Sequence, residues 1–202
     1  MKPRIAVLDY GMGNLRSVAK AIQRVDGTPL VTSNPADVEQ AAALVVPGVG
    51  AFGACMGNLE AAGLGDAIRT FGGSGRPVLG VCLGMQVLFD WSEEGAVDGL
   101  GLLEGKVQRL PNGEKIPHMG WNSVTWTRDH PLLTGIPNET LFYFVHSYVA
   151  SPSADVVVGE TDYGVPFASI VAQGNIVGMQ FHPEKSGSAG LEIYRNLVRE
   201  AA

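Results

Sequence analysis

Gly80-Val81-Cys82-Leu83-Gly84-Met85-Gln86 is the stretch that decides the fold of this chain. It follows the short apolar run 77–79, typical of the end of a buried strand, and precedes residues 87–91, which we expect to form the first turns of a helix. Glycines on both sides of the cysteine allow a tight turn that exposes the Cys82 side chain above the sheet. A helix N-terminus beside the sulfur favours the thiolate. The stretch therefore predicts a nucleophilic cysteine, with a buried structural cysteine as the alternative.

The residues before this turn alternate between apolar strand-like runs and helical patterns. We expect strands at 4–9, 29–32, 43–46 and 77–81, and helices at 14–25, 35–41, 52–62 and 65–71. This alternation predicts a parallel sheet covered by helices on both faces, with the chemistry beyond the carboxyl ends of the strands. Gly11-Met12-Gly13 is not a dinucleotide-binding fingerprint, because the third glycine is missing and no acidic residue clearly ends the second strand.

The second half of the chain has a different pattern of predicted secondary structure. Residues 102–182 contain mostly β-type runs, including a hairpin of 168–171 with 176–181, and an amphipathic helix over 191–198 closes the chain. We therefore expect an α/β fold whose mostly parallel central sheet is extended by antiparallel strands. No linker or repeat interrupts the pattern, so we predict a single domain spanning residues 1–202.

Composition excludes several classes of function. The net charge is −6 and no block of Lys and Arg is present, which argues against binding to nucleic acid or to an anionic membrane surface. No apolar run is long enough for a signal peptide or a membrane span. Two cysteines are too few for a disulfide framework. We expect a cytoplasmic protein in a reducing compartment, which permits a free catalytic thiol.

A cysteine nucleophile needs a base and a group that orients the base. His182 ends the apolar run 176–181, and Pro183 then turns the chain so that Glu184 can reach back to the ring. A strand-end histidine followed by a surface glutamate is the alternative. The other histidines fit less well, because they lie in a polar turn, in an unusual loop without a nearby carboxylate, and at a strand end: His130, His118 and His146.

The oxyanion formed during acyl transfer needs backbone N–H donors. We expect one from Leu83, directly after the nucleophile, and another from Pro47-Gly48-Val49-Gly50, where the glycines let the backbone approach or rotate. A simple strand-to-helix turn is the alternative for that second segment. Cys55 lies in a helical stretch with no histidine near it in sequence, so we expect it to be structural.

The segments 47–50 and 80–86, followed by Phe181-His182-Pro183-Glu184, resemble the class I (triad) glutamine amidotransferases over essentially the whole chain. Members of that family hydrolyse the side-chain amide of glutamine and pass ammonia to a synthase. Residues 10–14, the sequence Pro-Gly-Val-Gly, and residues 117–122 and 142–148 are similar to the glutaminase subunits of imidazole glycerol phosphate synthase, an enzyme of histidine biosynthesis.

This resemblance implies a flavodoxin-like fold, no metal or cofactor, and a heterodimer with a separate (β/α)₈-barrel cyclase subunit. It implies a catalytic triad of Cys82, His182 and Glu184, with Val49 and Leu83 at the oxyanion hole. Glutamine would be held by Gly50, Gln86, His146, Ser147 and Tyr148. Asn14, Met119, Trp121 and Lys185 would lie at the partner interface and the ammonia exit.

Three other functions stay open at this point. A cysteine peptidase of similar fold would be acylated by peptides instead of free glutamine. A glutaminase serving another synthase, such as that for pyridoxal 5′-phosphate, would lack the 117–121 loop. A non-catalytic regulatory subunit would leave Cys82 unlabelled by a glutamine-like electrophile.

Overall fold

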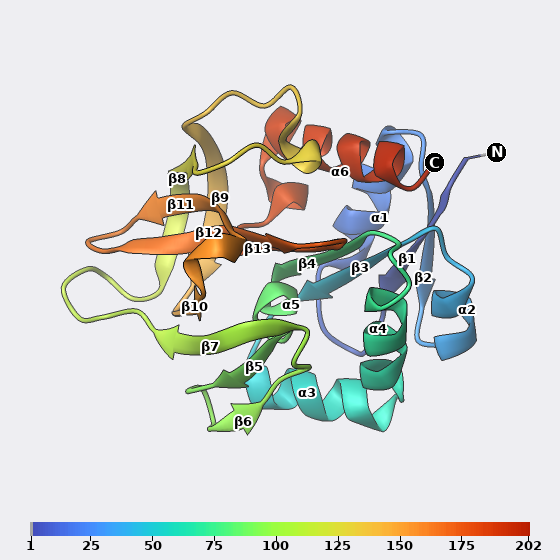
Figure 1. Cartoon of the computed structure of the whole chain (residues 1–202), viewed down its shortest axis with the longest axis horizontal. Coiled ribbons are helices and arrows are strands. Elements are labelled where there is room, and N and C mark those ends of the chain that lie inside the picture. The colour runs from blue at the N-terminus through green and yellow to red at the C-terminus, as the bar shows by residue number, and fades with distance from the viewer. Residues whose placement is uncertain (1) are drawn as a thin grey trace.

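The computed structural model describes residues 2–202 and arranges thirteen strands of these residues in one sheet (Figure 1). In one half of the sheet, every pair of neighbouring strands is parallel. Its strand order is β2 (Thr28–Thr32), β1 (Arg4–Leu8), β3 (Ala43–Gly48), β4 (Val78–Cys82) and β13 (Ile176–Met179). This 2-1-3-4-5 order is that of the flavodoxin-like folds, whose ligands bind beyond the carboxyl ends of the strands.

The other half of the sheet is mixed and grows from β13. The path continues through β12 (Pro166–Gln173), β10 (Tyr148–Pro152), β7 (Leu103–Arg109), β5 (Phe89–Ser92) and β6 (Val97–Asp98). A branch off β12 adds β11 (Val157–Asp162), β8 (His118–Trp126) and β9 (Thr140–His146), all antiparallel to their neighbours. The expected fold class, with antiparallel strands extending a parallel sheet, is confirmed.

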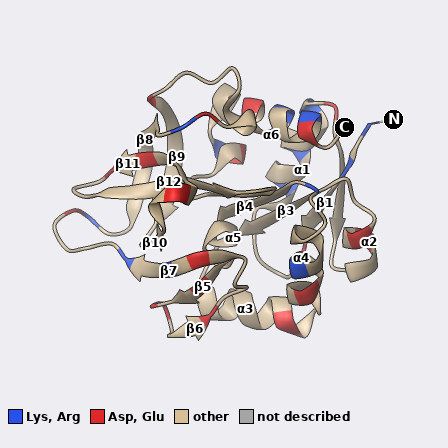
Figure 2. Cartoon of the chain, viewed as in Figure 1, with Lys and Arg blue, Asp and Glu red and all other residues tan. Residues whose placement is uncertain are grey.

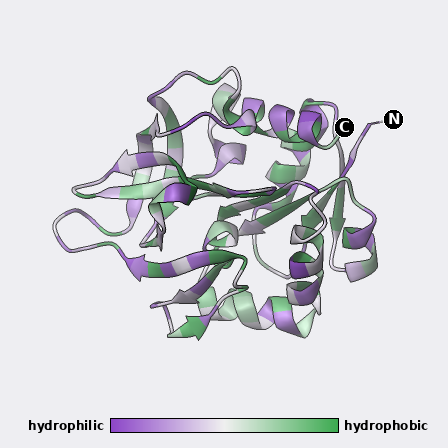
Figure 3. Cartoon of the chain, viewed as in Figure 1, coloured by the Kyte–Doolittle hydropathy of each residue, from purple (hydrophilic) through white to green (hydrophobic). Residues whose placement is uncertain are grey.

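Helices cover both faces of the parallel half because its strands are apolar on both sides. In β1, Ile5 and Val7 belong to one buried cluster, whereas Ala6 and Leu8 belong to the other. The first cluster is covered by α1 (Leu15–Arg24) and α6 (Gly187–Glu200). The second is covered by α2 (Pro35–Glu39), α3 (Phe52–Ala61) and α4 (Leu64–Gly72), and Figure 3 shows the hydrophobic strands between these layers.

Charged side chains of both signs are interspersed along the helices and strands (Figure 2). No helix within residues 2–202 is long and apolar enough to cross a bilayer.

The helix expected over residues 87–91 is wrong. The helix after the elbow, α5 (Leu83–Gln86), is a single turn, and residues 89–92 form β5 parallel to β7. The carbonyl groups of Val87 and Leu88 accept hydrogen bonds from the N–H groups of Leu100 and Leu102, at 2.8 Å each. Backbone pairing with a later segment therefore replaces the intrahelical bonds that would continue α5.

One further expectation needs correction, and two helix starts lack a capping side chain. The segment expected as a loop around His118 is the start of β8, since residues 118–124 pair in register with β9. Asn14 occupies the N-cap position of α1, but its side chain makes no capping hydrogen bond. Ser186, at the N-cap position of α6, makes no capping hydrogen bond either, because its hydroxyl group donates to the His182 carbonyl oxygen at 2.6 Å.

The turn after β4 packs backbone against backbone on the end of β3. A Cβ atom added to Gly84 would lie 1.8 Å from the carbonyl oxygen of Val46, and one added to Gly48 would lie 2.6 Å from the Gly84 nitrogen. Neither neighbour is a flexible side chain, so the two segments meet only because both positions are glycine. This contact sets the distance between the cysteine turn and residues 47–50.

We expect Gly84→Ala to lower the free energy of unfolding by at least about 3 kcal/mol, because backbone must shift to admit the methyl group. Urea unfolding followed by circular dichroism measures the change. Gly57→Ala is the matched control: it lies inside α3 with nothing within 4 Å of the added Cβ atom, and it should stabilise the protein by about 0.5–1 kcal/mol. Equal stability of the two variants would contradict the packing argument.

Candidate active site

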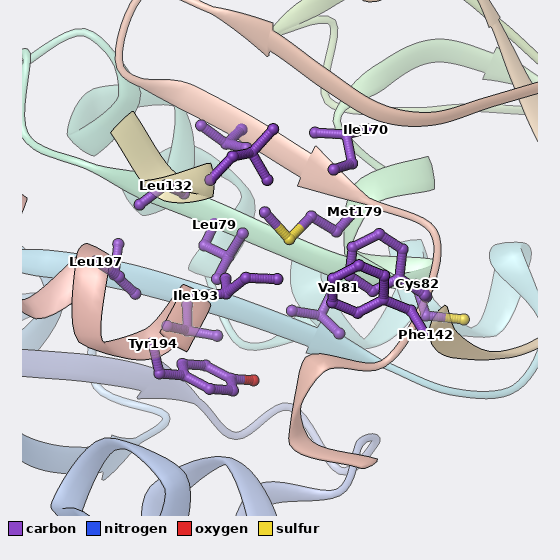
Figure 4. Close-up of a cluster of buried hydrophobic side chains, with 14 of the residues drawn as sticks. Leu79, Val81, Cys82, Leu132, Phe142, Ile170, Met179, Ile193, Tyr194 and Leu197 are labelled. Atoms are coloured by element: carbon purple, nitrogen blue, oxygen red, sulfur yellow. The ribbon is translucent and has the colours of Figure 1, made fainter. Parts of the chain in front are cut away.

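Cys82 is the last residue of β4 and has an unusual backbone conformation. Its φ of 54° and ψ of −112° lie in a region that non-glycine residues rarely adopt, at a cost of about 1–3 kcal/mol. The strand-to-helix context and the positive φ together match the nucleophile elbow predicted from the sequence. Figure 4 shows the Cys82 sulfur at the edge of a buried apolar cluster, pointing away from the cluster.

The sulfur borders a cavity of about 400 Å³. Except for Glu184, every residue that the sequence analysis assigned to the catalytic, oxyanion and substrate sites lies in its wall. These residues are Val49, Gly50, Cys82, Leu83, Gln86, His146, Ser147, Tyr148 and His182. They come from the ends of β3, β4 and β9, from the start of β10, from α5, and from the segment after β13. The carboxyl edge of the parallel strands therefore holds the cavity, as expected for this fold.

His182 and Glu184 form a buried pair behind the cavity. The Nδ1–H group of His182 donates to Glu184 Oε1 at 2.9 Å, and both side chains are almost fully buried. The 3-10 turn Pro183–Lys185 bends the chain so that the carboxylate reaches back to the ring. The other ring nitrogen, Nε2, is buried without a hydrogen-bond partner among residues 2–202, so it is free to exchange a proton with a reacting group.

The charge state of His182 depends on its neighbours. Burial alone would lower its pKa, but Cys82 and Glu184 outweigh burial and raise the pKa to about 9. The imidazole therefore holds a proton readily while the carboxylate fixes that proton's position. This is the behaviour required of a base that must later act as an acid.

The oxyanion segment 47–50 is anchored from below by a residue that the sequence analysis missed. The buried Tyr10 hydroxyl group donates to the Pro47 carbonyl oxygen and accepts from Cys55 Sγ at 3.5 Å. In the register of β3 with β4, Gly48 lies opposite Cys82. Gly50 has a φ of 104°, which only glycine adopts without strain. Burial raises the pKa of Cys55 to about 11, in keeping with a structural thiol.

Buried polar groups hold the opposite wall of the cavity. Gln86 Nε2 and His146 Nδ1–H both donate to the Tyr148 carbonyl oxygen at 2.9 Å. His118 Nδ1–H donates to His146 Nε2 at 2.9 Å, and burial lowers the pKa of His146 to about 3. Both rings are therefore neutral donors and acceptors that fix the wall.

Glu94 also lies in this wall, and the sequence analysis missed it. Its Oε2 accepts from the backbone N–H of Phe52 at 3.0 Å, which ties the carboxylate to the start of α3. No local pattern around Glu94 marks it, because it lies in the turn after β5 and reaches the cavity only through the fold. A carboxylate at this position is suited to hold an ammonium group.

Two of the predicted interface residues are large apolar side chains that project from β8 into solvent. Met119 is 62% exposed and Trp121 is 56% exposed. Trp121 packs edge-on against Tyr143 of β9, and Lys185 Nζ lies 5.7 Å from the centre of the same Tyr143 ring. Asn14 lies at the start of α1, which packs against the 183–185 turn. Exposed apolar residues grouped in this way are typical of a protein–protein contact.

Residues 6–201 match the family described as "Glutamine amidotransferase class-I". The chain is 52% identical over 206 residues to "Imidazole glycerol phosphate synthase subunit HisH" of Moorella thermoacetica, covering 100% of this chain and 98% of the relative. It is 52% identical over 195 residues to the protein of the same name from Methanothermobacter thermautotrophicus, covering 96% and 97%. The chain belongs to the class I glutamine amidotransferases, in their HisH family. The resemblance drawn from the sequence motifs is confirmed.

Solved structures support the fold of this amidotransferase. "Structure of PurLQS from Thermotoga maritima" aligns with a TM-score of 0.79 at 20% identity, covering 98% of this chain and 99% of that one. "Crystal structure of glutamine amidotransferase" aligns with a TM-score of 0.77 at 21% identity and 98% coverage of both chains.

We expect the raised pKa of His182 to make the stability of this amidotransferase pH-dependent. The folded-state value of about 9 lies above the ordinary 6.5, so protonated His182 stabilises the fold below pH 6.5 and this contribution is lost as the pH rises to 9. Across that window the free energy of unfolding should fall by about 3 kcal/mol. Urea unfolding at intervals between pH 6 and 9.5 measures it.

His182→Asn is the control for this prediction, because the variant keeps both cysteines and loses only the ring. Its unfolding free energy should vary much less with pH than that of the wild type. His146 does not contribute to the window, since its lowered pKa affects stability only below pH 6.5. The same slope in both proteins would contradict the assignment.

Proposed function

We propose that this glutamine amidotransferase hydrolyses glutamine to glutamate and ammonia through Cys82, His182 and Glu184. The proposal depends on one observation: His182 Nδ1 and Glu184 Oε1 form a buried pair at 2.9 Å, and His182 lies on the same cavity as Cys82, which is held in a nucleophile elbow. A cysteine peptidase is disfavoured, because the chain belongs to a family of glutamine amidotransferases.

The reaction begins when the Cys82 thiolate attacks the carbon of the side-chain amide. Leu83 and the 47–50 segment supply N–H donors to the oxyanion. Protonated His182 then gives its Nε2 proton to the leaving ammonia, and a glutamyl thioester remains on the sulfur. His182 next takes a proton from water, which hydrolyses the thioester to glutamate and restores the thiolate. Glu184 keeps the ring in one tautomer throughout both steps.

The proposed chemistry fixes how glutamine lies in the cavity. Its amide carbon must reach Cys82, so its α-carbon end lies toward the part of the wall formed by Glu94 and residues 146–148. Glu94 pairs with the α-ammonium group, and Gly50, Gln86 and the 146–148 segment complete the site. The volume of about 400 Å³ is sufficient for one amino acid of this size.

We propose that the ammonia is delivered to a separate (β/α)₈-barrel cyclase subunit in histidine biosynthesis. The relatives at about 50% identity are named as subunits of imidazole glycerol phosphate synthase, which favours this synthase over one for pyridoxal 5′-phosphate. The exposed group of Met119, Trp121 and Lys185, with Asn14 beside the 183–185 turn, is the proposed docking face. Two free cysteines fit the reducing cytosol, and the whole chain would act as one domain.

The decisive experiment measures glutamate release by the complex with its cyclase subunit and the cyclase ligand. Cys82→Ala should lose at least about a thousandfold in kcat while its thermal unfolding stays near that of the wild type. His182→Asn should lose nearly as much, and Glu184→Gln less, because the base remains and only its orientation is lost. Cys55→Ala is the matched thiol control and should keep activity. Normal turnover by Cys82→Ala would refute the proposal and revive a regulatory subunit without catalysis.

Removal of one anchor tests the docking face. Trp121→Ala should weaken binding to the cyclase subunit at least about tenfold in calorimetry, since large exposed aromatic residues dominate interface energies. Val31→Ala, which removes an exposed apolar side chain on β2, should leave binding unchanged. Equal binding by both variants would place the contact elsewhere.

A further inference from the structure

Gln180 is a buried amide that touches the nucleophile and plays no part in the mechanism above. It directly follows β13, has no exposed surface, and is anchored by its backbone N–H to the Ser169 carbonyl oxygen at 2.9 Å. Its Nε2 donates to Cys82 Sγ at 3.7 Å, and its Oε1 accepts from Gln86 Nε2 at 3.0 Å. The side chain therefore bridges the sulfur and a residue of the substrate wall.

The direction of this amide is fixed by a chain of partners. The Tyr148 carbonyl oxygen can only accept, so Gln86 must present its NH₂ group on that side. The second hydrogen of the same NH₂ group then points to Gln180, which must accept this hydrogen bond with Oε1. With its oxygen held there, Gln180 has only its NH₂ group to offer to the sulfur. His146 also donates to the Tyr148 carbonyl oxygen. Both lone pairs of that oxygen are therefore used, one by Gln86 and one by His146.

Two hydrogen-bonding groups that contact the sulfur favour opposite protonation states of it. The Val145 carbonyl oxygen lies 3.9 Å from Sγ and suits a thiol, because it can only accept. The Gln180 N–H suits a thiolate, because it can only donate. The ionisable groups around the sulfur are His182 with Glu184 behind it, His146 and Glu94 in the cavity wall, and Tyr10 beneath the oxyanion segment. Gln180 donates a hydrogen bond to the sulfur, and His182 Nε2, which has no hydrogen-bond partner among residues 2–202, lies on the same cavity.

We propose that Gln180 is a further residue of the catalytic machinery, whose amide N–H holds and stabilises the Cys82 thiolate before glutamine binds. The proposal rests on the proposed function, in which Cys82 is the nucleophile. A donor held in place by buried partners does for the thiolate part of what hydration does in solution, without reorganising during the reaction. Gln86 acts one step further away by holding the Gln180 amide in the productive orientation.

Alkylation of Cys82 by iodoacetamide tests the proposal, since the thiolate is the reacting form. A Cys55→Ala background leaves one thiol, and the assay needs neither glutamine nor the cyclase subunit. Gln180→Met keeps the volume and removes the donor, so we expect the alkylation rate at pH 7 to fall about tenfold and the midpoint of its pH profile to rise. Gln180→Glu keeps an acceptor for Gln86 but places a carboxylate oxygen, in place of the N–H donor, beside the sulfur. The alkylation rate should therefore fall more than in Gln180→Met.

Glutaminase kinetics of the complex supply the second readout. Gln180→Met should lower kcat with a smaller change in KM, because the sulfur and not the substrate loses a contact. A purely structural role would change thermal stability and leave the alkylation profile in place. If both folded variants alkylate like the background protein, the proposal is overturned; if the buried carboxylate prevents folding, Gln180→Met alone decides. Failure of the function itself would instead appear as glutamate release by Cys82→Ala.

Discussion

Gly84 lies so close to the carbonyl oxygen of Val46 that no side chain fits between them, and the geometry of the site depends on this contact. It brings the turn after β4 against the end of β3, so direct contact between backbone atoms sets the spacing of the nucleophile and the oxyanion segment. Buried backbone contacts have few alternative arrangements. The strained conformation of Cys82 persists because the strands and helices around it leave it no other position.

Much of this arrangement could be predicted from local sequence. Apolar runs ending in glycine turns indicated the parallel strands, and Cys82 between two glycines indicated the elbow. His182 followed by Pro183-Glu184 indicated a base with a carboxylate within reach, and the ring and carboxylate oxygen are 2.9 Å apart in the structure. These features were readable because each is set by residues adjacent in the chain: a turn needs glycine, and a proline bends the backbone.

The remaining features depend on partners that are distant in sequence. Tyr10 anchors Pro47, and Gln180 meets Cys82, only after the sheet has brought those segments together. The helix expected over 87–91 failed for the same reason, since the pairing that makes β5 comes from β7. His118 was interpreted as part of a loop because its local sequence does not show that residues 118–124 pair with β9. In the structure Phe144 and Tyr163 stack on its ring. Long-range pairing decided each of these cases, and single-sequence patterns do not carry it.

The position of β13 has a consequence for the order in which the molecule becomes reactive. This strand is inserted between β4 and β12, and Gln180 at its end lies 98 residues after Cys82 in the chain. Closing so long a segment is entropically costly and is repaid only when the intervening strands are in place. A growing or partly folded chain therefore carries its cysteine without a base. The thiol acquires its base only when the segment after β13 has joined the sheet next to β4.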